Sequence, residues 1–305
     1  MSEPRQGWAI ALHGGATEIS DEEAPAYRRG CERAARAGIE ILEAGGSAVD
    51  AVVAAVRVLE ADATFNAGVT RVRDENGRVR CDAAVMDGTT LDVGAVAGVE
   101  AVRHPVDVAF SLLRDEPTLI VGEAAERLAA ERGLDGPPLG DLAPANGGPG
   151  DAHSTGRAHD TVGCVAVDLA GHVACAVSTG GLPGMPAGRV GDSALPGCGF
   201  AADDEVGAVV LSGTGERIAR MTLGAWALER TRDTDPVIVA GAAVERLERI
   251  GGDVGILVLD RAGSIGWAHS SPRFAVAWAR SGTEVSSFVH AAQPGGSRAG
   301  EGEAA

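Results

Sequence analysis

The 305-residue sequence contains no lysine, so arginine supplies all 26 of its basic side chains. Without lysine the chain cannot form a Schiff base through an ε-amine or hold phosphate as a P-loop does. Basic charge is scarce as well: 43 acidic residues give a formal net charge of -17, and the sequence has no run of basic residues. Such a charge repels phosphate backbones and anionic lipids, so we expect neither nucleic acid nor a membrane as a partner.

Long apolar runs and cysteine motifs are also missing. No stretch approaches the roughly 18 apolar residues that span a bilayer, and the N-terminus lacks the basic and apolar regions of a secretion signal. The five cysteines are odd in number, include no C-x-x-C pair and stand apart from any histidine cluster. We therefore expect a cytoplasmic protein with free thiols, no zinc site and no catalytic cofactor.

The apolar periodicity predicts strands and helices that occur in blocks. An apolar run predicts a strand at 8–12, and Asn76-Gly77 predicts a hairpin turn between strands at 70–72 and 80–85. Further strands are expected at 161–167, 172–178, 206–211, 255–259 and 265–269. Helices are expected at 22–43, 47–59, 105–114, 122–132, 216–230 and 236–250.

Two segments lack any apolar period. Residues 134–159 are rich in Gly, Pro, Asp and Ala and predict a flexible linker, whereas residues 293–305 predict a disordered tail. The blocked strands and helices elsewhere favour an α+β fold of stacked sheets between helical layers. We expect a single catalytic domain that spans residues 1–305.

A threonine that opens a strand directly after the linker gives the first indication of chemistry. Cleavage of the bond between Asp160 and Thr161 would leave Thr161 with a free α-amine at the tip of that strand. With a pKa of about 7.7 to 8.0, an α-amine can accept the proton of the neighbouring hydroxyl near neutral pH. The same hydroxyl can cut the chain first, by attacking the Asp160 carbonyl to give an ester that water hydrolyses. The alternative is that a lone threonine at such a position has only a structural role, in packing or in capping.

Three later segments contain residues that suit an active site. Thr179 follows one strand further on, and antiparallel pairing would bring it near Thr161. In the segment GRVGDS, Arg189 suits a carboxylate and Asp192 suits an ammonium group. In the segment SGTGE, Ser212 supplies a hydroxyl and the glycines allow backbone amides to approach an oxyanion. Together these segments predict a pocket for the two charged ends of an amino acid.

The motifs resemble those of the plant-type asparaginases and isoaspartyl peptidases, with the aspartylglucosaminidases as close relatives. The resemblance covers nearly all of residues 8–280 and rests on ALHGGA, FNAG, DAAVMDG, GAVAGV, HDTVG, STGG, GRVGDS and GWAHSSP. It implies a four-layer αββα sandwich of the N-terminal nucleophile hydrolase type. It also implies self-cleavage into an α subunit, residues 1–160, and a β subunit, residues 161–305, with a homodimer of such αβ pairs as the assembly.

By the same resemblance, each matching residue has a role. Thr161 is the nucleophile, and Thr179 supports its hydroxyl and amine. Arg189 and Asp192 bind the α-carboxylate and α-amine of the substrate. The remaining positions are Ser212 and Gly213, which stabilise the oxyanion, and Gly215, which lines the substrate pocket together with Gly213.

Some members of this family hold a structural sodium ion in the loop that precedes and includes FNAG. An ion here would bind mostly through backbone carbonyls, and a plain glycine turn is the alternative. The matching positions are Leu59, Glu60, Asp62, Phe65, Ala67 and Val69.

The resemblance implies release of L-aspartate from L-asparagine or from β-aspartyl (isoaspartyl) dipeptides through a threonine-bound aspartyl ester. Two departures from the family pattern bear on this expectation. The motif HDT is shared with the aspartylglucosaminidases, so a glycosylasparaginase is an alternative. The segment 182–186 replaces a lysine that is common before GRVGDS. A non-catalytic amino-acid-binding protein that stays uncleaved is the other alternative.

Overall fold

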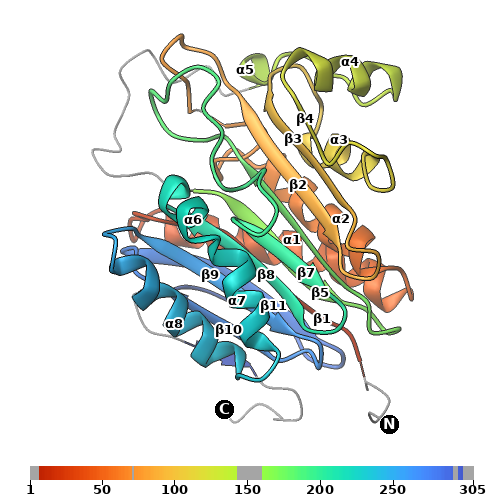
Figure 1. The fold of residues 1–305 in the computed structure, drawn as a ribbon, viewed down its shortest axis with the longest axis vertical. Coiled ribbons are helices and arrows are strands. Elements are labelled where there is room, and N and C mark those ends of the chain that lie inside the picture. The colour runs from red at the N-terminus through yellow and green to blue at the C-terminus, as the bar shows by residue number, and fades with distance from the viewer. Residues whose placement is uncertain (1–6, 71, 143–159, 291–294, 298–305) are drawn as a thin grey trace.

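The computed structural model describes residues 7–70, 72–142, 160–290 and 295–297. These residues form an eight-stranded sheet, a five-stranded sheet and helices (Figure 1). The larger sheet has the spatial order β12 (Ser286–His290), β11 (Arg273–Arg280), β1 (Ala9–Thr17), β5 (Val162–Val167), β6 (Val173–Thr179), β2 (Cys81–Asp87), β3 (Val93–Val99) and β4 (Leu119–Val121). The smaller sheet has the order β13 (Gly295–Ser297), β10 (Ile265–His269), β9 (Val254–Asp260), β8 (Gly207–Gly213) and β7 (Phe200–Asp203).

Neighbouring strands pair antiparallel in both sheets, except β3 and β4, which are parallel. The helices before residue 143 are α1 (Ala24–Glu43), α2 (Ala48–Glu60), α3 (Pro105–Ser111), α4 (Glu123–Glu131) and α5 (Leu139–Leu142). The later helices are α6 (Gly215–Met221), α7 (Leu223–Thr231) and α8 (Pro236–Glu248).

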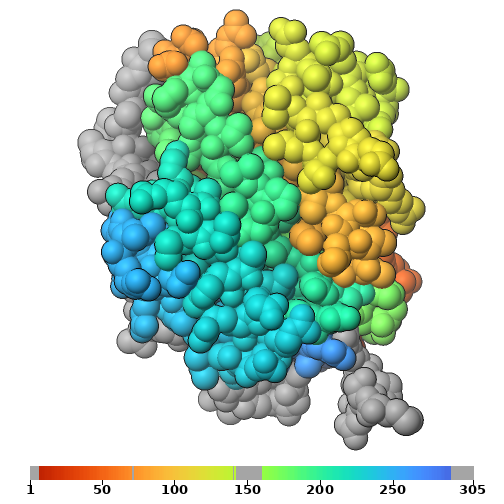
Figure 2. Space-filling view, in the orientation of Figure 1, coloured from red at the N-terminus to blue at the C-terminus, as the bar shows by residue number. Residues whose placement is uncertain are grey.

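Three apolar clusters show how the elements pack. One lies between α1–α3 and a face of the larger sheet, the second lies between the two sheets, and the third lies between the smaller sheet and α6–α8. Helices α1 and α2 therefore cover one side of the paired sheets, and α7 and α8 cover the opposite side (Figure 1). In the space-filling view, α6–α8, the 180–199 segment and the α3–α4 region adjoin one another over the front of the molecule (Figure 2). Strands buried on both faces explain the near-continuous apolar runs in the sequence.

The ends of α1 and α2 follow local sequence signals. Ser20 and Glu23 exchange side-chain-to-backbone hydrogen bonds just before α1, in the manner of a capping box. Gly45, at a φ of 79°, ends that helix in a left-handed conformation. Ser47 then caps α2, because its Oγ accepts the amide hydrogen of Asp50 at 3.1 Å. The expected boundary between these two helices is confirmed.

The predicted hairpin around Asn76-Gly77 is wrong. A turn does form there, because Asp74 accepts hydrogen bonds from the amides of Asn76 and Arg78. No strand precedes it at the described residues Thr70 and Val72, and β2 pairs with β3 and β6 instead. The local turn signal was correct, but the following strand pairs with the next strand, β3, and with the distant strand β6.

Three other expectations differ from the structure. The helix expected at 216–230 is two helices, because Thr222 has a φ of 43° and interrupts it. Within the predicted linker, α5 forms and Asp135 bridges to Val102, whereas residues 143–159 lie outside the described part. Within the predicted tail, β13 pairs with β10, and the rest of the tail is likewise outside the described residues.

Two expectations from composition can be compared with the structure. All five cysteines are buried, free thiols, as expected. Among the described helices, none combines the length and the apolar character that crossing a bilayer requires.

Phe274 on β11 joins the two sheets, and its loss should be costly. Its ring is fully buried and lies so close to Gly255 on β9 that an added Cβ would be 2.6 Å away. We expect Phe274→Ala to lower the free energy of unfolding by about 3–5 kcal/mol, measured by urea denaturation, because it leaves a cavity between the sheets. Leu169→Ala is the control: that side chain is 52% exposed, and its loss should change stability by less than about 0.5 kcal/mol. Equal losses in the two variants would contradict this account of the core.

Candidate active site

The site lies at the end of the larger sheet where β5 begins and β6 ends. Val162 pairs with Ser178 in the antiparallel register of β5 and β6. Continuing this register by one residue places Thr161 opposite Thr179. Both side chains are buried, with exposures of 7% and 4%. The pairing expected from the sequence therefore brings the two threonines together, and Asp82 on β2 flanks Thr179 on its other side.

Each threonine hydroxyl has a close polar neighbour. The Oγ1 of Thr161 lies 3.4 Å from the Oγ of Ser193. The Oγ1 of Thr179 accepts the amide hydrogen of Gly181 at 3.1 Å. No role was predicted for Ser193, although it ends the GRVGDS motif. The one sequence signal that could have placed Ser193 beside Thr161 was its position directly after Asp192.

A small cavity of about 10 Å³ adjoins Thr161. With the chain continuous through Asp160, this volume is about that of one water molecule and too small for an amino acid. The cavity brings together Thr179, Arg189, Asp192 and Gly213 with Thr161. Its full lining is Asp160, Thr161, Thr179, Gly181, Leu182, Arg189, Gly191, Asp192, Ser193 and Gly213.

Arg189 and Asp192 supply opposite charges to this cavity. The Nε of Arg189 donates to Glu216 Oε1 at 2.8 Å, so the guanidinium is already oriented by an acidic partner. Burial raises the pKa of Asp192 to about 7, because desolvation disfavours the carboxylate more than Arg189 favours it. Glu216 and Asp82 raise it further by charge repulsion. An incoming ammonium group would supply the positive charge that this carboxylate lacks.

Asp82 is a second buried carboxylate near the same guanidinium. Its Oδ1 accepts the amide hydrogen of Gly98 at 2.8 Å. Burial raises the pKa of Asp82 to about 6, opposed by Gly98, by the charge of Arg189 and by the backbone of Gly191. Asp82 lies in the DAAVMDG segment, and no role was predicted for it. Its carboxyl group interacts electrostatically with Arg189 and contacts the backbone of Gly191 in the same loop.

The residues expected around the oxyanion occupy different places. Gly213 lines the cavity, but Ser212 and Gly215 are not among its lining residues. The Oγ of Ser212 accepts the amide hydrogen of Ala16 on β1 at 3.1 Å, so this hydroxyl bridges the two sheets. Gly215 lies against the anchors: an added Cβ would be 2.6 Å from Asp192 Oδ1 and 3.1 Å from Arg189 Nη2. Glycine at 215 leaves the room that both charged side chains need.

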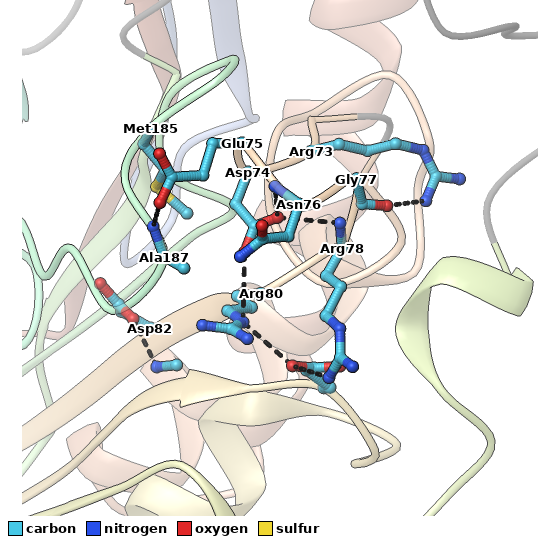
Figure 3. A network of polar contacts seen from close by, with 12 residues as sticks. Arg73, Asp74, Glu75, Asn76, Gly77, Arg78, Arg80, Asp82, Met185 and Ala187 are labelled. Atoms are coloured by element: carbon cyan, nitrogen blue, oxygen red, sulfur yellow. Dashed lines mark hydrogen bonds and ion pairs between the residues drawn. The ribbon is translucent and has the colours of Figure 1, made fainter.

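The segment 182–186, which replaces the lysine common in the family, is held by a neighbouring loop (Figure 3). The amide of Glu75 donates to the Met185 carbonyl at 2.9 Å, and the Glu75 carboxylate accepts from the Ala187 amide at 2.9 Å. Arg80 fixes the base of this loop through ion pairs with Asp74 and Glu100. Hydrogen bonds from a separate loop thus position the chain just before Arg189.

Asp160, the residue before Thr161, is also buried. The hydroxyl of Tyr27 on α1 donates to Asp160 Oδ2 at 3.1 Å. Burial raises the pKa of Asp160 to about 8, opposed by the Tyr27 hydrogen bond and reinforced by Glu23. Gly15 provides the space beside it, since an added Cβ would lie 1.8 Å from Asp160 Oδ1. The Tyr27 contact joins residues 133 positions apart, which no local pattern indicates.

His13 is a neutral, structural neighbour of this site. Burial lowers its pKa to about 3, with a smaller opposing effect from the Thr161 backbone. Its ring packs against Phe274, with centroids 5.4 Å apart. At neutral pH the imidazole carries no charge. His159, the other histidine near the cleavage site, lies outside the described residues.

The residues expected to hold sodium lie at the end of α2 and in the loop that follows it. The Val69 amide donates to the Glu60 carbonyl at 2.9 Å, and the Phe65 amide donates to the Asp62 carbonyl at 3.0 Å. The Glu60 side chain faces away from the loop, with Oε1 accepting the Val106 amide at 3.0 Å and Oε2 lying 3.3 Å from His104 Nδ1. No cluster of acidic, histidine or cysteine side chains suited to a metal occurs in the described chain. The carbonyls of Leu59, Glu60 and Asp62 thus already accept backbone hydrogen bonds.

Comparisons with known proteins agree with this arrangement. The sequence model of the asparaginase family matches residues 6–143 and 140–289. The chain belongs to the asparaginase family. An isoaspartyl peptidase/L-asparaginase of Danio rerio is 38% identical over 285 residues, covering 88% of this chain and 91% of that protein.

Two microbial relatives are similar over an equal extent. An isoaspartyl peptidase of Salmonella typhimurium is 37% identical over 310 residues, covering 92% of this chain and 98% of its own length. A plant-type L-asparaginase of Pyrobaculum calidifontis is 37% identical over 291 residues, covering 90% of this chain and 97% of its own length. This asparaginase-family chain therefore aligns with these three relatives along more than nine-tenths of their length.

The buried Asp192 carboxylate predicts a stability effect that depends on pH. Its pKa of about 7 lies above the ordinary 3.8, so ionisation costs stability progressively as pH rises between these values and the full cost is present above pH 7. In the Thr161→Ala background, which lacks the Thr161 hydroxyl, Asp192→Asn should raise the free energy of unfolding at pH 8 by about 1–3 kcal/mol. The gain should be smaller at pH 5.

Urea denaturation of single and double variants at the two pH values tests this. Asp233→Asn is the control, because it makes the same substitution at an exposed aspartate. It should change the free energy of unfolding little at either pH. A gain from Asp192→Asn that is equal at pH 5 and pH 8 would show that the buried charge is not its cause.

Proposed function

We propose that this protein is a threonine amidohydrolase that releases L-aspartate from L-asparagine and from β-aspartyl dipeptides after cutting itself between Asp160 and Thr161. The observation that carries the proposal is the shared cavity of Thr161, Thr179, Arg189 and Asp192. Relatives at 36–38% identity bear the names isoaspartyl peptidase and L-asparaginase. The two paired sheets with helices on both outer faces support a four-layer sandwich of the N-terminal nucleophile hydrolase type.

Self-cleavage comes first in the proposed sequence. The hydroxyl of Thr161 attacks the carbonyl carbon of Asp160, and the bond from that carbon to the Thr161 nitrogen breaks. The nitrogen takes the hydroxyl proton and becomes a free α-amine. Water then hydrolyses the ester, which leaves Asp160 with a new carboxylate and restores the Thr161 hydroxyl.

Turnover uses the same hydroxyl on a substrate amide. Arg189 binds the substrate α-carboxylate and Asp192 binds its α-ammonium, which presents the side-chain amide to Thr161. The hydroxyl attacks the amide carbon while the α-amine of Thr161 takes the proton and passes it to the departing nitrogen. Gly213 lies where its backbone can approach the developing oxyanion, and the Ser212 hydroxyl, one residue earlier, holds this strand against β1. Water hydrolyses the aspartyl ester and releases aspartate.

Replacement of Thr161 tests both steps. Thr161→Ala should give an intact chain on a denaturing gel and no aspartate release, because the hydroxyl is required twice. Thr161→Ser keeps the hydroxyl and should still cleave and turn over substrate, more slowly. The intact mass of the wild-type protein after overnight incubation separates this proposal from an uncleaved binding protein. A Thr161→Ala variant that still splits into two chains would refute the assignment of the nucleophile.

The sodium ion inferred from family resemblance is a second, separate proposal. It would bind mostly through backbone carbonyls at the positions Leu59, Glu60, Asp62, Phe65, Ala67 and Val69. An ion that binds the folded state alone raises the melting temperature with its concentration. We expect a higher Tm in sodium chloride than in choline chloride of equal ionic strength, measured by calorimetry on the cleaved protein. Equal Tm values in the two salts would exclude a stabilising sodium site.

A further inference from the structure

Asp82 on β2 is a buried carboxylate beside the site that has no part in the proposed reaction. It pairs with Thr179 across β2 and β6, and it is 5% exposed. The lining residues described for the small cavity do not include Asp82. A substrate in that cavity would not touch Asp82, so any effect of this carboxylate on the substrate must pass through neighbouring residues.

A bulge in β3 brings one backbone amide to Asp82. The register of β2 and β3 shifts next to this residue, between Cys81 and Ala83. Gly98, on the opposite side of the shift, has a φ of 66°, a conformation that glycine adopts without the strain a side chain would bring. Its amide donates to Asp82 Oδ1 at 2.8 Å (Figure 3). The irregular pairing thus holds the carboxylate from β3.

Asp82 also contacts the GRVGDS segment, which forms the 188–193 loop. The backbone of Gly191 donates a hydrogen bond to the Asp82 carboxyl group, and the charge of Arg189 acts on the same group. Gly191 lies against the guanidinium, since an added Cβ would be 2.9 Å from Arg189 Nη1. One carboxylate therefore joins the central sheet to the loop at the point where the loop meets its own arginine.

Two acidic groups of different exposure act on Arg189. Its Nε donates to Glu216 Oε1 at 2.8 Å, and the Glu216 side chain is 55% exposed. Asp82 is buried, so water and salt screen its charge much less. Burial raises the pKa of Asp82 to about 6, which leaves the carboxyl group ionised at pH 7.5. A buried charge costs stability unless donors and a cation surround it, and those around Asp82 belong to β3 and the 188–193 loop.

We propose that Asp82 is a positioning residue for substrate binding, which fixes the 188–193 loop to the sheet and thereby sets the position of Arg189. This inference rests on the proposed amidohydrolase function, in which Arg189 binds the substrate α-carboxylate. Loss of Asp82 should therefore weaken binding of the substrate. Self-cleavage needs no bound carboxylate, because the Asp160 carbonyl is already part of the chain, so it should continue.

Asp82→Asn tests this, because it keeps the size of the side chain but removes its charge and one of its two acceptor oxygens. At pH 7.5 we expect the KM of the cleaved protein for β-aspartyl-leucine to rise about tenfold or more, the effect of losing a hydrogen bond to a charged group. The kcat should change by less than about threefold. The fraction of cleaved chain on a denaturing gel should equal that of the wild type.

Asp87→Asn is the matched control, since it makes the same substitution on the same strand. Asp87 lies outside the lining described for the small cavity, and its Oδ1 accepts the amide hydrogen of Thr89 at 2.9 Å. Its replacement should leave KM, kcat and self-cleavage unchanged.

A double variant shows whether Asp82 acts through Arg189. Arg189→Lys keeps a positive charge but lacks the planar guanidinium, so it should raise KM by itself. Adding Asp82→Asn to Arg189→Lys should raise KM by less than about twofold more, because the two changes affect one interaction. If the two increases in KM multiply instead, Asp82 acts by another route and the inference is wrong.

Three other results would overturn the inference. An unchanged KM in Asp82→Asn would show that the loop needs no support from Asp82. A lower KM would show that the negative charge of Asp82 repels the substrate carboxylate more than it positions Arg189. A loss of self-cleavage in parallel with the rise in KM would place the effect at Thr179.

Further measurements separate a folding defect and a wrong function from these results. Thermal melting checks that Asp82→Asn folds, and if it does not, Asp82→Ser, which keeps one acceptor oxygen, is measured with the same expectations. If the cleaved wild-type protein hydrolyses neither asparagine nor β-aspartyl-leucine, the proposed function itself is wrong. If the wild type is active and Asp82→Asn has the same KM, only the role of Asp82 is wrong.

Discussion

The antiparallel pairing of β5 with β6 is the constraint on which the rest of the site depends. Its register places Thr161 opposite Thr179, and the next pairing, β6 with β2, adds Asp82 beside them. A shift of one residue would turn every side chain of β5 to the opposite face of the sheet. Because the strands are buried on both faces, such a shift would remove apolar packing against α2 on one side and against β8 on the other. The core thus stabilises the position of the nucleophile.

Electrostatics is the second constraint, because the site buries more negative charge than it neutralises. Arg189 faces the carboxylates of Asp192 and Asp82 and donates to Glu216. Burial raises the pKa values of both aspartates, so they hold their protons more tightly than exposed carboxylates do. A bound amino acid would add an ammonium beside Asp192 and a carboxylate beside Arg189.

The proposed cleavage would separate the intact chain directly after Asp160. Asp160 occupies space next to Thr161, contacts Tyr27 and forms part of the wall of the small cavity. Gly15 and Gly215 leave room in this crowded region because they lack a Cβ. An added Cβ would collide with Asp160 at position 15 and with Asp192 at position 215.

Sequence alone indicated the candidate catalytic groups and determined much of the local structure. A strand-opening threonine, the GRVGDS spacing and the glycine-rich segments pointed to the proposed nucleophile and substrate anchors, because these signals are short and close together. The same holds for the ends of α1 and α2, where capping is a local interaction. Tertiary structure decided the roles of Ser193, Asp82 and Tyr27, the bridging position of Ser212, the partners of β2 and the break at Thr222. Those features depend on which distant segments pack against one another, and the free energy of that packing outweighs local turn and helix signals.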